Sequence, residues 1–285
     1  MSSFVVSKED VKNFGMQPTL KNMSGIFYLY ATTEGAVKKV LPSPLEFIAP
    51  AVIGYYVGFS HTTFGGPYTE FMIGVPASYK GQIGVYPLSL MLAGHGAEMA
   101  VKAGTNCVGF PKKIADDMQI SRNGNEVKTK LVRHGVTIFE CTVDIDGAYN
   151  TPDAEAILAI NKPGDIVPGG YYVHHLDYMQ TEQGNMEFKE VDLAMLLTEH
   201  TVKTFEPGKL AEVKVNSSAD DAYGELEVVA PMAACYFETD GITMKATRHL
   251  ESLEPEAVMP YLMTARFDRG MMGDEIRYMT NFMSK

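Results

Sequence analysis

The clearest structural pattern in the chain is MQISRNGNEVKTKLVRHGVTIFECTV, residues 118–143. Two turn sequences, Asn123-Gly124-Asn125 and His134-Gly135, divide it into three segments, and glycine and asparagine tolerate the backbone of tight hairpin turns. Within the segments, apolar residues such as Val127 and Leu131 alternate with polar residues. This alternation predicts a three-stranded antiparallel meander that packs on one face and meets solvent on the other.

Further patterns lie on both sides of this meander. Runs rich in β-branched and aromatic residues predict strands at 27–32, 51–59, 170–178, 187–193, 198–203, 211–216 and 226–238. Helices are predicted at 34–40, at 90–103 with Gly104 as a left-handed cap, and at 254–283 with interruptions near Gly270 and Gly273. The Gly- and Pro-rich stretch 161–170 is predicted to be a long loop.

Strand and helix segments do not alternate regularly, which argues against a doubly wound parallel sheet. We therefore predict a mainly β (α+β) fold, a closed or nearly closed antiparallel β-barrel with peripheral helices. No internal repeat or low-complexity linker is visible. Residues 1–285 are expected to form a single domain, with 245–285 as a C-terminal helical extension.

The composition excludes some classes of partner. The chain of 285 residues has a formal net charge of -11 at pH 7, which opposes attraction to phosphate backbones and anionic lipid. We expect no nucleic acid and no membrane as partner. The sequence shows no secretory leader and no apolar run of membrane-spanning length, so we expect a cytoplasmic location.

Several common chemical motifs are missing. The sequence contains no P-loop, no dinucleotide-binding glycine pattern, no zincin motif and no nucleophile elbow. The pair His174-His175 does not indicate a metal site, because neighbours on a strand point to opposite faces. One of the two should face the interior, where it could shuttle protons near a substrate. We expect neither a metal nor an organic cofactor.

The strongest chemical signal is TNCVGFPKK, residues 105–113, which ends in Lys112-Lys113. Only a neutral amine is a nucleophile, and a lysine at the reference pKa near 10.4 is less than about 0.1% neutral at pH 7. Desolvation by apolar neighbours such as Val108 and Phe110, and the charge of an adjacent ammonium, would both disfavour the protonated form. Adjacent lysines alone prove little, since Lys38-Lys39 is expected to be an exposed helical pair.

Four blocks of sequence match one family pattern in order and spacing: Val40-Leu-Pro-Ser-Pro-Leu-Glu46, Pro67-Tyr-Thr-Glu70, Val75-Pro-Ala-Ser-Tyr-Lys-Gly81 and Gly109-Phe-Pro-Lys-Lys113. They resemble the acetoacetate decarboxylase family. The resemblance implies a cone-like antiparallel barrel in a homo-oligomer that acts on a small keto acid through a Schiff base. It also implies three catalytic residues: Lys112 as the covalent nucleophile, Lys113 as the neighbour whose charge favours the neutral form of Lys112, and Glu70 as the acidic residue.

Two positions depart from that family. Met23 stands where the decarboxylases carry an arginine, the natural partner of a substrate carboxylate, and Gly104-Thr105-Asn106 replaces their G-R-E. Other basic residues are candidates to replace the arginine: Lys21, Arg122 and Arg133.

Three functions therefore stay open. In the first, the iminium formed by Lys112 accepts the electrons released when a small β-keto acid loses CO2. In the second, a pyruvate-like donor forms an enamine for an aldolase-dehydratase reaction. In the third, the barrel binds a small acid without turnover. In each case we expect Tyr68, Phe110 and His174 to bind the substrate.

Overall fold

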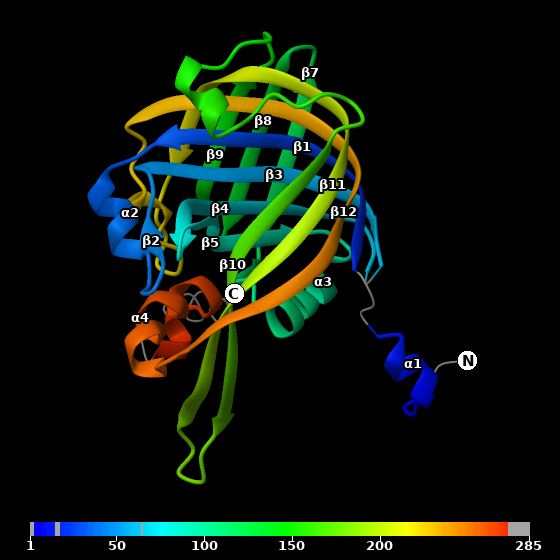
Figure 1. Cartoon of the computed structure of the whole chain (residues 1–285), viewed down its shortest axis with the longest axis vertical. Coiled ribbons are helices and arrows are strands. Elements are labelled where there is room, and N and C mark those ends of the chain that lie inside the picture. The colour runs from blue at the N-terminus through cyan, green and yellow to red at the C-terminus, as the bar shows by residue number, and fades with distance from the viewer. Residues whose placement is uncertain (1–2, 15–17, 64, 273–285) are drawn as a thin grey trace, which may run out of the picture.

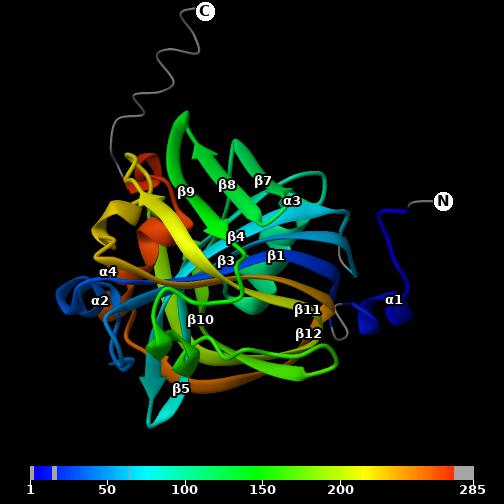
Figure 2. The same ribbon diagram turned by 90° about the horizontal axis from the view of Figure 1, so that it is seen from above.

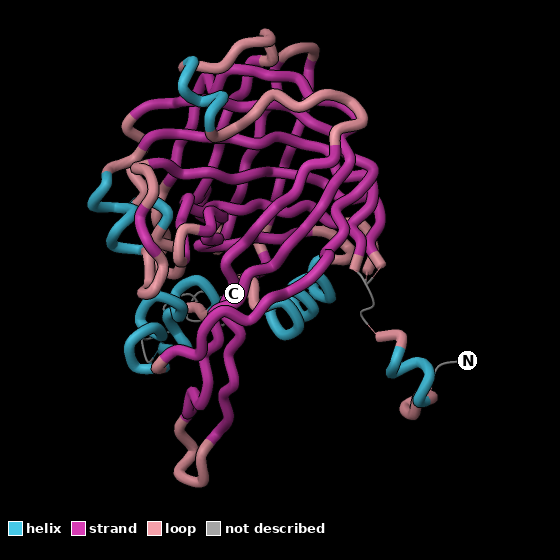
Figure 3. Tube along the Cα trace, in the orientation of Figure 1, coloured by secondary structure: helices cyan, strands magenta, loops and turns pink. Residues whose placement is uncertain are grey.

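The computed structural model describes residues 3–14, 18–63 and 65–272, and strands dominate it (Figures 1 and 3). The strands are β1 (Thr19–Ala31), β2 (Glu46–Phe47), β3 (Ala51–Thr62), β4 (Tyr68–Tyr79), β5 (Gln82–Ala93), β6 (Lys112–Ile114), β7 (Asp117–Asn123), β8 (Glu126–Arg133), β9 (Val136–Asp144), β10 (Ile166–Gln180), β11 (Met186–Val215) and β12 (Ala230–Leu253). The predicted mainly β fold is confirmed.

Short helices lie around the sheet. They are α1 (Lys8–Lys12), α2 (Glu34–Val40), α3 (Ala97–Ala103), which continues as the π-helix Gly104–Val108, and α4 (Pro255–Arg266), with 3-10 turns at Pro152–Ala156, Tyr223–Glu225 and Arg269–Met272. No described helix has the length and apolar character needed to cross a bilayer.

The sheet closes into a ring, as predicted. Its strands follow the order β10-β5-β4-β3-β1-β12-β11, and β10 pairs again with β11 to complete the circle, which Figure 2 shows from above. The ring is mixed where we expected only antiparallel pairs, because β5 pairs in parallel with both β6 and β10. The parallel pair β5–β6 is possible because α3 and the π-helix form the crossover between them.

The predicted meander is confirmed: β7, β8 and β9 pair antiparallel, and β9 joins the second half of β11. Three predicted strands within 187–216 form the single long strand β11. The chain does not turn at the interruptions that we expected. It shifts register instead, for example at Leu193/Ala194 and Leu197/Thr198, as β-bulges allow.

Other predictions were wrong in their boundaries. The helix predicted from residue 90 begins only at Ala97, because β5 continues to Ala93 with apolar side chains on both faces, a pattern that periodicity does not separate from a buried helix. Gly104 is right-handed, and the left-handed residue is Gly109 at φ 85°. The predicted loop 161–170 already enters β10 at Ile166. The predicted helical extension 245–285 begins as strand, since β12 runs to Leu253, and residues 273–285 lie outside the described residues.

Alternating side chains of the ring strands fill two separate apolar clusters. The first core cluster joins ring residues to the meander and includes Ile26, Tyr28, Phe71, Leu131 and Phe139. The second core cluster lies on the other face of the same strands and includes Met23, Tyr55, Met72, Leu90 and Phe110. Burial on both faces explains the nearly continuous apolar character of β3 to β5.

Candidate active site

Strand β6 places the two lysines of the signature segment on opposite faces. Lys112 pairs with Leu90 and Lys113 with Met91 of β5, and these partners belong to the second and the first core cluster respectively. Successive residues of a strand point to opposite faces. The adjacent lysines therefore have different neighbours.

Lys112 forms a buried ion pair with Glu70. Lys112 Nζ lies 2.6 Å from Glu70 Oε2, and each side chain is only 3% exposed. The other carboxylate oxygen, Oε1, accepts a hydrogen bond of 2.6 Å from the Tyr55 hydroxyl. Because a buried carboxylate needs partners for its charge, the amine and the hydroxyl together hold Glu70 in one orientation. The amine, the predicted nucleophile, can pass a proton directly to the predicted acidic residue.

Three tyrosines surround this carboxylate. Burial, followed by the charge of Glu70, raises the pKa of Tyr55 and of Tyr68 well above the usual value, and raises the pKa of Tyr171 to about 12. All three therefore stay protonated as hydrogen-bond donors at neutral pH. Within the described part of the chain, the buried Tyr68 hydroxyl has no hydrogen-bond partner, so this predicted substrate-binding residue offers a donor to a ligand.

Phe110 and the π-helix cover Lys112. The Phe110 ring centroid lies 5.5 Å from Lys112 Nζ, and its ring meets that of Tyr171 edge to face. Gly104, the first residue of the π-helix, leaves no room for a side chain, since a Cβ there would lie 2.5 Å from Lys112 Cε. π-helical turns occur often at functional sites. This one brings the backbone against the candidate nucleophile.

Lys113 enters a network of charges instead. Its Nζ lies 3.2 Å from Asp221 Oδ1 and 3.1 Å from Asp268 Oδ1, and it donates to the Asp220 carbonyl oxygen. Arg133 binds the same two carboxylates, Asp221 and Asp268, at 2.9 and 2.8 Å. The positive charge of Lys113 is therefore compensated, which does not favour the predicted role of Lys113 as a source of positive charge beside Lys112.

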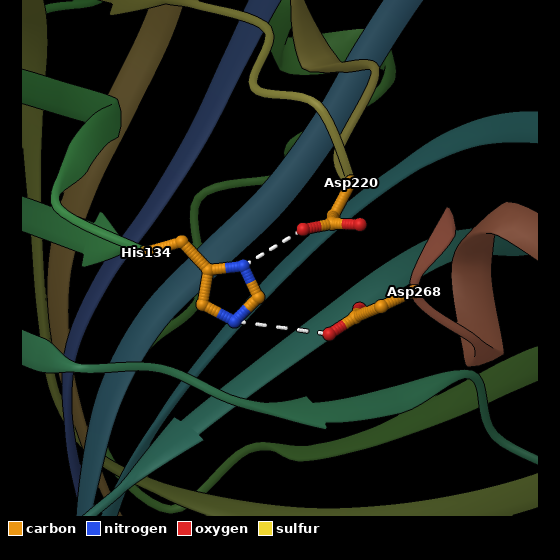
Figure 4. A group of neighbouring side chains, drawn as sticks. All are labelled: His134, Asp220 and Asp268. Atoms are coloured by element: carbon orange, nitrogen blue, oxygen red, sulfur yellow. Dashed lines mark hydrogen bonds and ion pairs between the residues drawn. The ribbon is translucent and has the colours of Figure 1, made fainter. Parts of the chain in front are cut away.

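His134, Asp220 and Asp268 form a compact group at the edge of this network (Figure 4). Their ligand atoms lie within 4.8 Å of one another, and His134 Nδ1 is 2.8 Å from Asp220 Oδ2. Three such residues could hold a metal ion, but Lys113 and Arg133 already bind the Asp268 oxygens. We interpret the group as part of the ion-pair network and draw no metal chemistry from it.

Of the two histidines, His174 is the buried one, at 2% exposed. Its ring meets Tyr86 edge to face, whereas its neighbours Tyr171 and Val173 face the second core cluster. Burial lowers the pKa of His174 to about 3, helped by the charges of Arg266 and His175. The described contacts do not bring His174 to the Lys112–Glu70 pair. Its predicted substrate contact stays a prediction.

The contacts in the described part of the chain place none of the three predicted replacements for the arginine beside Lys112. Met23 is fully buried in the second core cluster. Arg122 pairs with Glu206 away from that cluster, Arg133 belongs to the network of Lys113, and Lys21 is exposed.

Arg266 of α4 was not among the residues predicted from the sequence, although it contacts the signature segment. Its Nη2 donates to the carbonyl oxygens of Gly109 at 2.8 Å and His174 at 3.2 Å, and desolvation lowers its pKa to about 10. It joins α4 to the signature segment across 157 residues of sequence and to β10 across 92. A lone arginine in a predicted helical tail carries no signal for such a contact.

A known protein family and a known relative resemble this chain over most of its length. The family model described as acetoacetate decarboxylase (ADC) matches residues 6–253. A protein of Lactiplantibacillus plantarum named CLA biosynthesis isomerase is 36% identical over 274 residues, 94% of this chain and 96% of its own length. Acetoacetate decarboxylase 3 of Mesorhizobium japonicum is 36% identical over 134 residues, 47% of this chain and 50% of its own length.

The fold is also that of a solved decarboxylase. The crystal structure of acetoacetate decarboxylase from Legionella pneumophila superposes with a TM-score of 0.69 at 17% identity, and covers 88% of this chain and 99% of its own. The family match includes both Glu70 and Lys112, and the resemblance drawn from four sequence blocks is confirmed. The chain belongs to the acetoacetate decarboxylase family.

Proposed function

We propose that the protein is an imine-forming enzyme that moves a carbon–carbon double bond next to a ketone. Lys112 supplies the amine and Glu70 carries the proton. The observation that supports this most directly is the Lys112–Glu70 contact of 2.6 Å between two side chains that are each 3% exposed.

The reaction needs only these two groups and water. Glu70 takes the proton that it shares with Lys112, and the neutral amine adds to the carbonyl carbon of a β,γ-unsaturated ketone. Glu70 then gives that proton to the hydroxyl group, which leaves as water, so that the iminium forms and Glu70 is a carboxylate again. The Glu70 carboxylate then removes the proton between the iminium and the double bond, which gives a dienamine. Return of a proton to the γ-carbon yields the conjugated iminium, and water releases the conjugated ketone and restores the amine.

Two observations favour isomerisation over decarboxylation. Met23, at 1% exposed, places an apolar side chain in the second core cluster where the family resemblance expects an arginine, so nothing at that position would bind a substrate carboxylate. The relative that matches 94% of this chain carries the name of an isomerase, whereas the decarboxylase of Mesorhizobium japonicum matches about half of it.

Decarboxylation of a small β-keto acid is the second candidate. The family match over residues 6–253 favours it, and the same iminium would accept the electron pair of the C–C bond as CO2 leaves. Both reactions begin with the same covalent intermediate. Product analysis separates them.

The test uses borohydride, which reduces an imine to a stable amine. Incubation with acetone or a β,γ-unsaturated ketone, followed by reduction and peptide mass mapping, should place the adduct on Lys112. The Lys112→Met variant should give none, and Lys102→Met, which removes an exposed lysine of α3, should label like the parent protein. Absence of label from Lys112 in the parent protein would refute the proposal.

Three substrates then identify the reaction. Isomerisation predicts a conjugated ketone by its ultraviolet absorbance, without CO2. Release of CO2 from acetoacetate would establish the decarboxylase instead, and a conjugated product from pyruvate and an aldehyde would establish the aldolase-dehydratase. Labelling of Lys112 without turnover of any of the three would contradict the isomerase assignment and favour a binding protein.

A further inference from the structure

A cavity lies on the same face of the sheet as Lys112. The cavity has a volume of about 190 Å³ and is bounded by Phe27, Leu158, Val202, Phe205 and Phe237. Phe27 stacks on Phe237 with ring centroids 4.2 Å apart. Four of the five residues belong to or pack against the second core cluster, and the fifth, Val202, is 3% exposed. The cavity therefore borders the apolar layer that also holds the candidate nucleophile.

A single row of directly paired residues connects the cavity wall to Lys112. Across the sheet, Phe27 pairs with Tyr55, and Tyr55 pairs with Met72. Met72 pairs with Leu90, and Leu90 pairs with Lys112. Directly paired residues of adjacent strands project from the same face. The row is apolar from Phe27 to Leu90 except for the Tyr55 hydroxyl, which is bound to Glu70.

The lining of the cavity carries no formal charge. Among the residues that the structure describes, no lysine, arginine, aspartate or glutamate lines the cavity, and its polar side chains are Asn161 and His200. Burial lowers the pKa of His200, which keeps that ring neutral at pH 7. An apolar, uncharged cavity favours hydrocarbon and disfavours a carboxylate or a phosphate.

We propose that this cavity receives the end of a hydrocarbon tail on the carbonyl substrate. The carbonyl group binds at Lys112, and the tail runs along the row of paired residues to Phe27. The substrate is then a long-chain ketone, whereas a compact keto acid would leave the cavity unused. This inference rests on the proposed imine chemistry at Lys112. Each CH2 group that enters the cavity should tighten binding roughly fourfold, since it contributes about 0.8 kcal/mol.

The test compares straight-chain methyl ketones, from acetone to 2-tridecanone, in two assays. Borohydride trapping measures the ketone concentration that half-saturates Lys112, and the rise in Tm with ketone measures binding without chemistry. Val202→Phe fills the cavity, and Val202→Leu is a milder filling variant in case the phenylalanine prevents folding. Val40→Phe is the matched control, because Val40 lines a different cavity of about 240 Å³ between α2 and α4.

The long ketones should half-saturate Lys112 at concentrations at least tenfold lower than acetone, and Val202→Phe should remove this gain while acetone labels as before. Val40→Phe should keep the gain. Equal half-saturation by all ketones, or a gain that survives both Val202 variants, would overturn the tail site. If acetone fails to label Lys112, the imine proposal fails, and the Tm series alone still decides whether ketone tails bind in the cavity.

Discussion

Lys112 and Lys113 are identical and adjacent, yet they occupy opposite environments. Lys112 meets one carboxylate and an aromatic ring in an apolar layer. Lys113 meets two carboxylates beside Arg133. The two-residue period of a strand produces this difference, because it points the two side chains to opposite faces. The neighbours of each lysine, and not the residue type, therefore separate the candidate nucleophile from the lysine of the ion-pair network. This comparison can be tested from both sides of β6.

The largest effect should follow removal of the nucleophile. Lys112→Met should lower turnover by at least about 10³-fold, because the variant lacks the amine that pairs with Glu70 and forms the imine. Initial rates with the identified substrate measure this loss, with Lys102→Met as the control. A loss below tenfold would remove Lys112 from the chemistry.

The same change tests the buried pair itself. Lys112→Met leaves Glu70 buried without its cation, which should cost about 3–5 kcal/mol in the free energy of unfolding. Adding Glu70→Gln removes the uncompensated charge and should restore most of this loss. Urea unfolding of the single and double variants measures both values.

Lys113→Met should mainly weaken the fold, again by about 3–5 kcal/mol, because Asp221 and Asp268 lose one of their two cations. Urea unfolding measures the loss. In the molecules that remain folded, the pH profile of borohydride trapping at Lys112 should keep its midpoint, because the charge of Lys113 is already compensated. A midpoint at least one pH unit higher would show instead that Lys113 acts electrostatically on Lys112, as the family resemblance implied.

Gly104→Ala should act on the chemistry with little effect on the fold. The backbone of Gly104 is ordinary for a helix, at φ -65°, but the new Cβ would lie 2.5 to 3.1 Å from the end of the Lys112 side chain. The amine must move away from Glu70, and a misplacement of about 1 Å can cost about 10²-fold in rate. Gly35→Ala is the matched control, since a Cβ there meets nothing within 4 Å in α2. Full activity of Gly104→Ala would show that the amine tolerates displacement.

The sequence predicted the parts of the molecule that depend on local signals. The meander follows from Gly124 and Gly135 in its turns, and Lys112 and Glu70 were selected because whole blocks around them match a family. β11 was divided into three because a β-bulge and a turn look alike in sequence. Which cation meets which carboxylate depends on strand faces and on contacts between distant segments, such as Lys113 with Asp268 and Arg266 with Gly109. No local pattern records such pairs.

The smallest effect concerns His174, on the face of β10 away from Tyr171. The pKa of His174 is about 3 in the folded protein and near 6.5 in the unfolded chain. Between pH 3 and pH 6.5, the unfolded chain therefore binds a proton at His174 and the folded protein does not. The contribution of His174 to stability is therefore present above pH 6.5 and is lost as the pH falls toward 3. Between pH 7 and pH 5 the free energy of unfolding should fall by about 2 kcal/mol through this residue.

His174→Gln removes the titration of this side chain. The difference in the free energy of unfolding between parent and variant cancels the contributions of His175 and His200, whose pKa values burial also lowers. Urea unfolding at both pH values measures this difference, and a difference independent of pH would mean that the His174 ring accepts a proton in the folded protein.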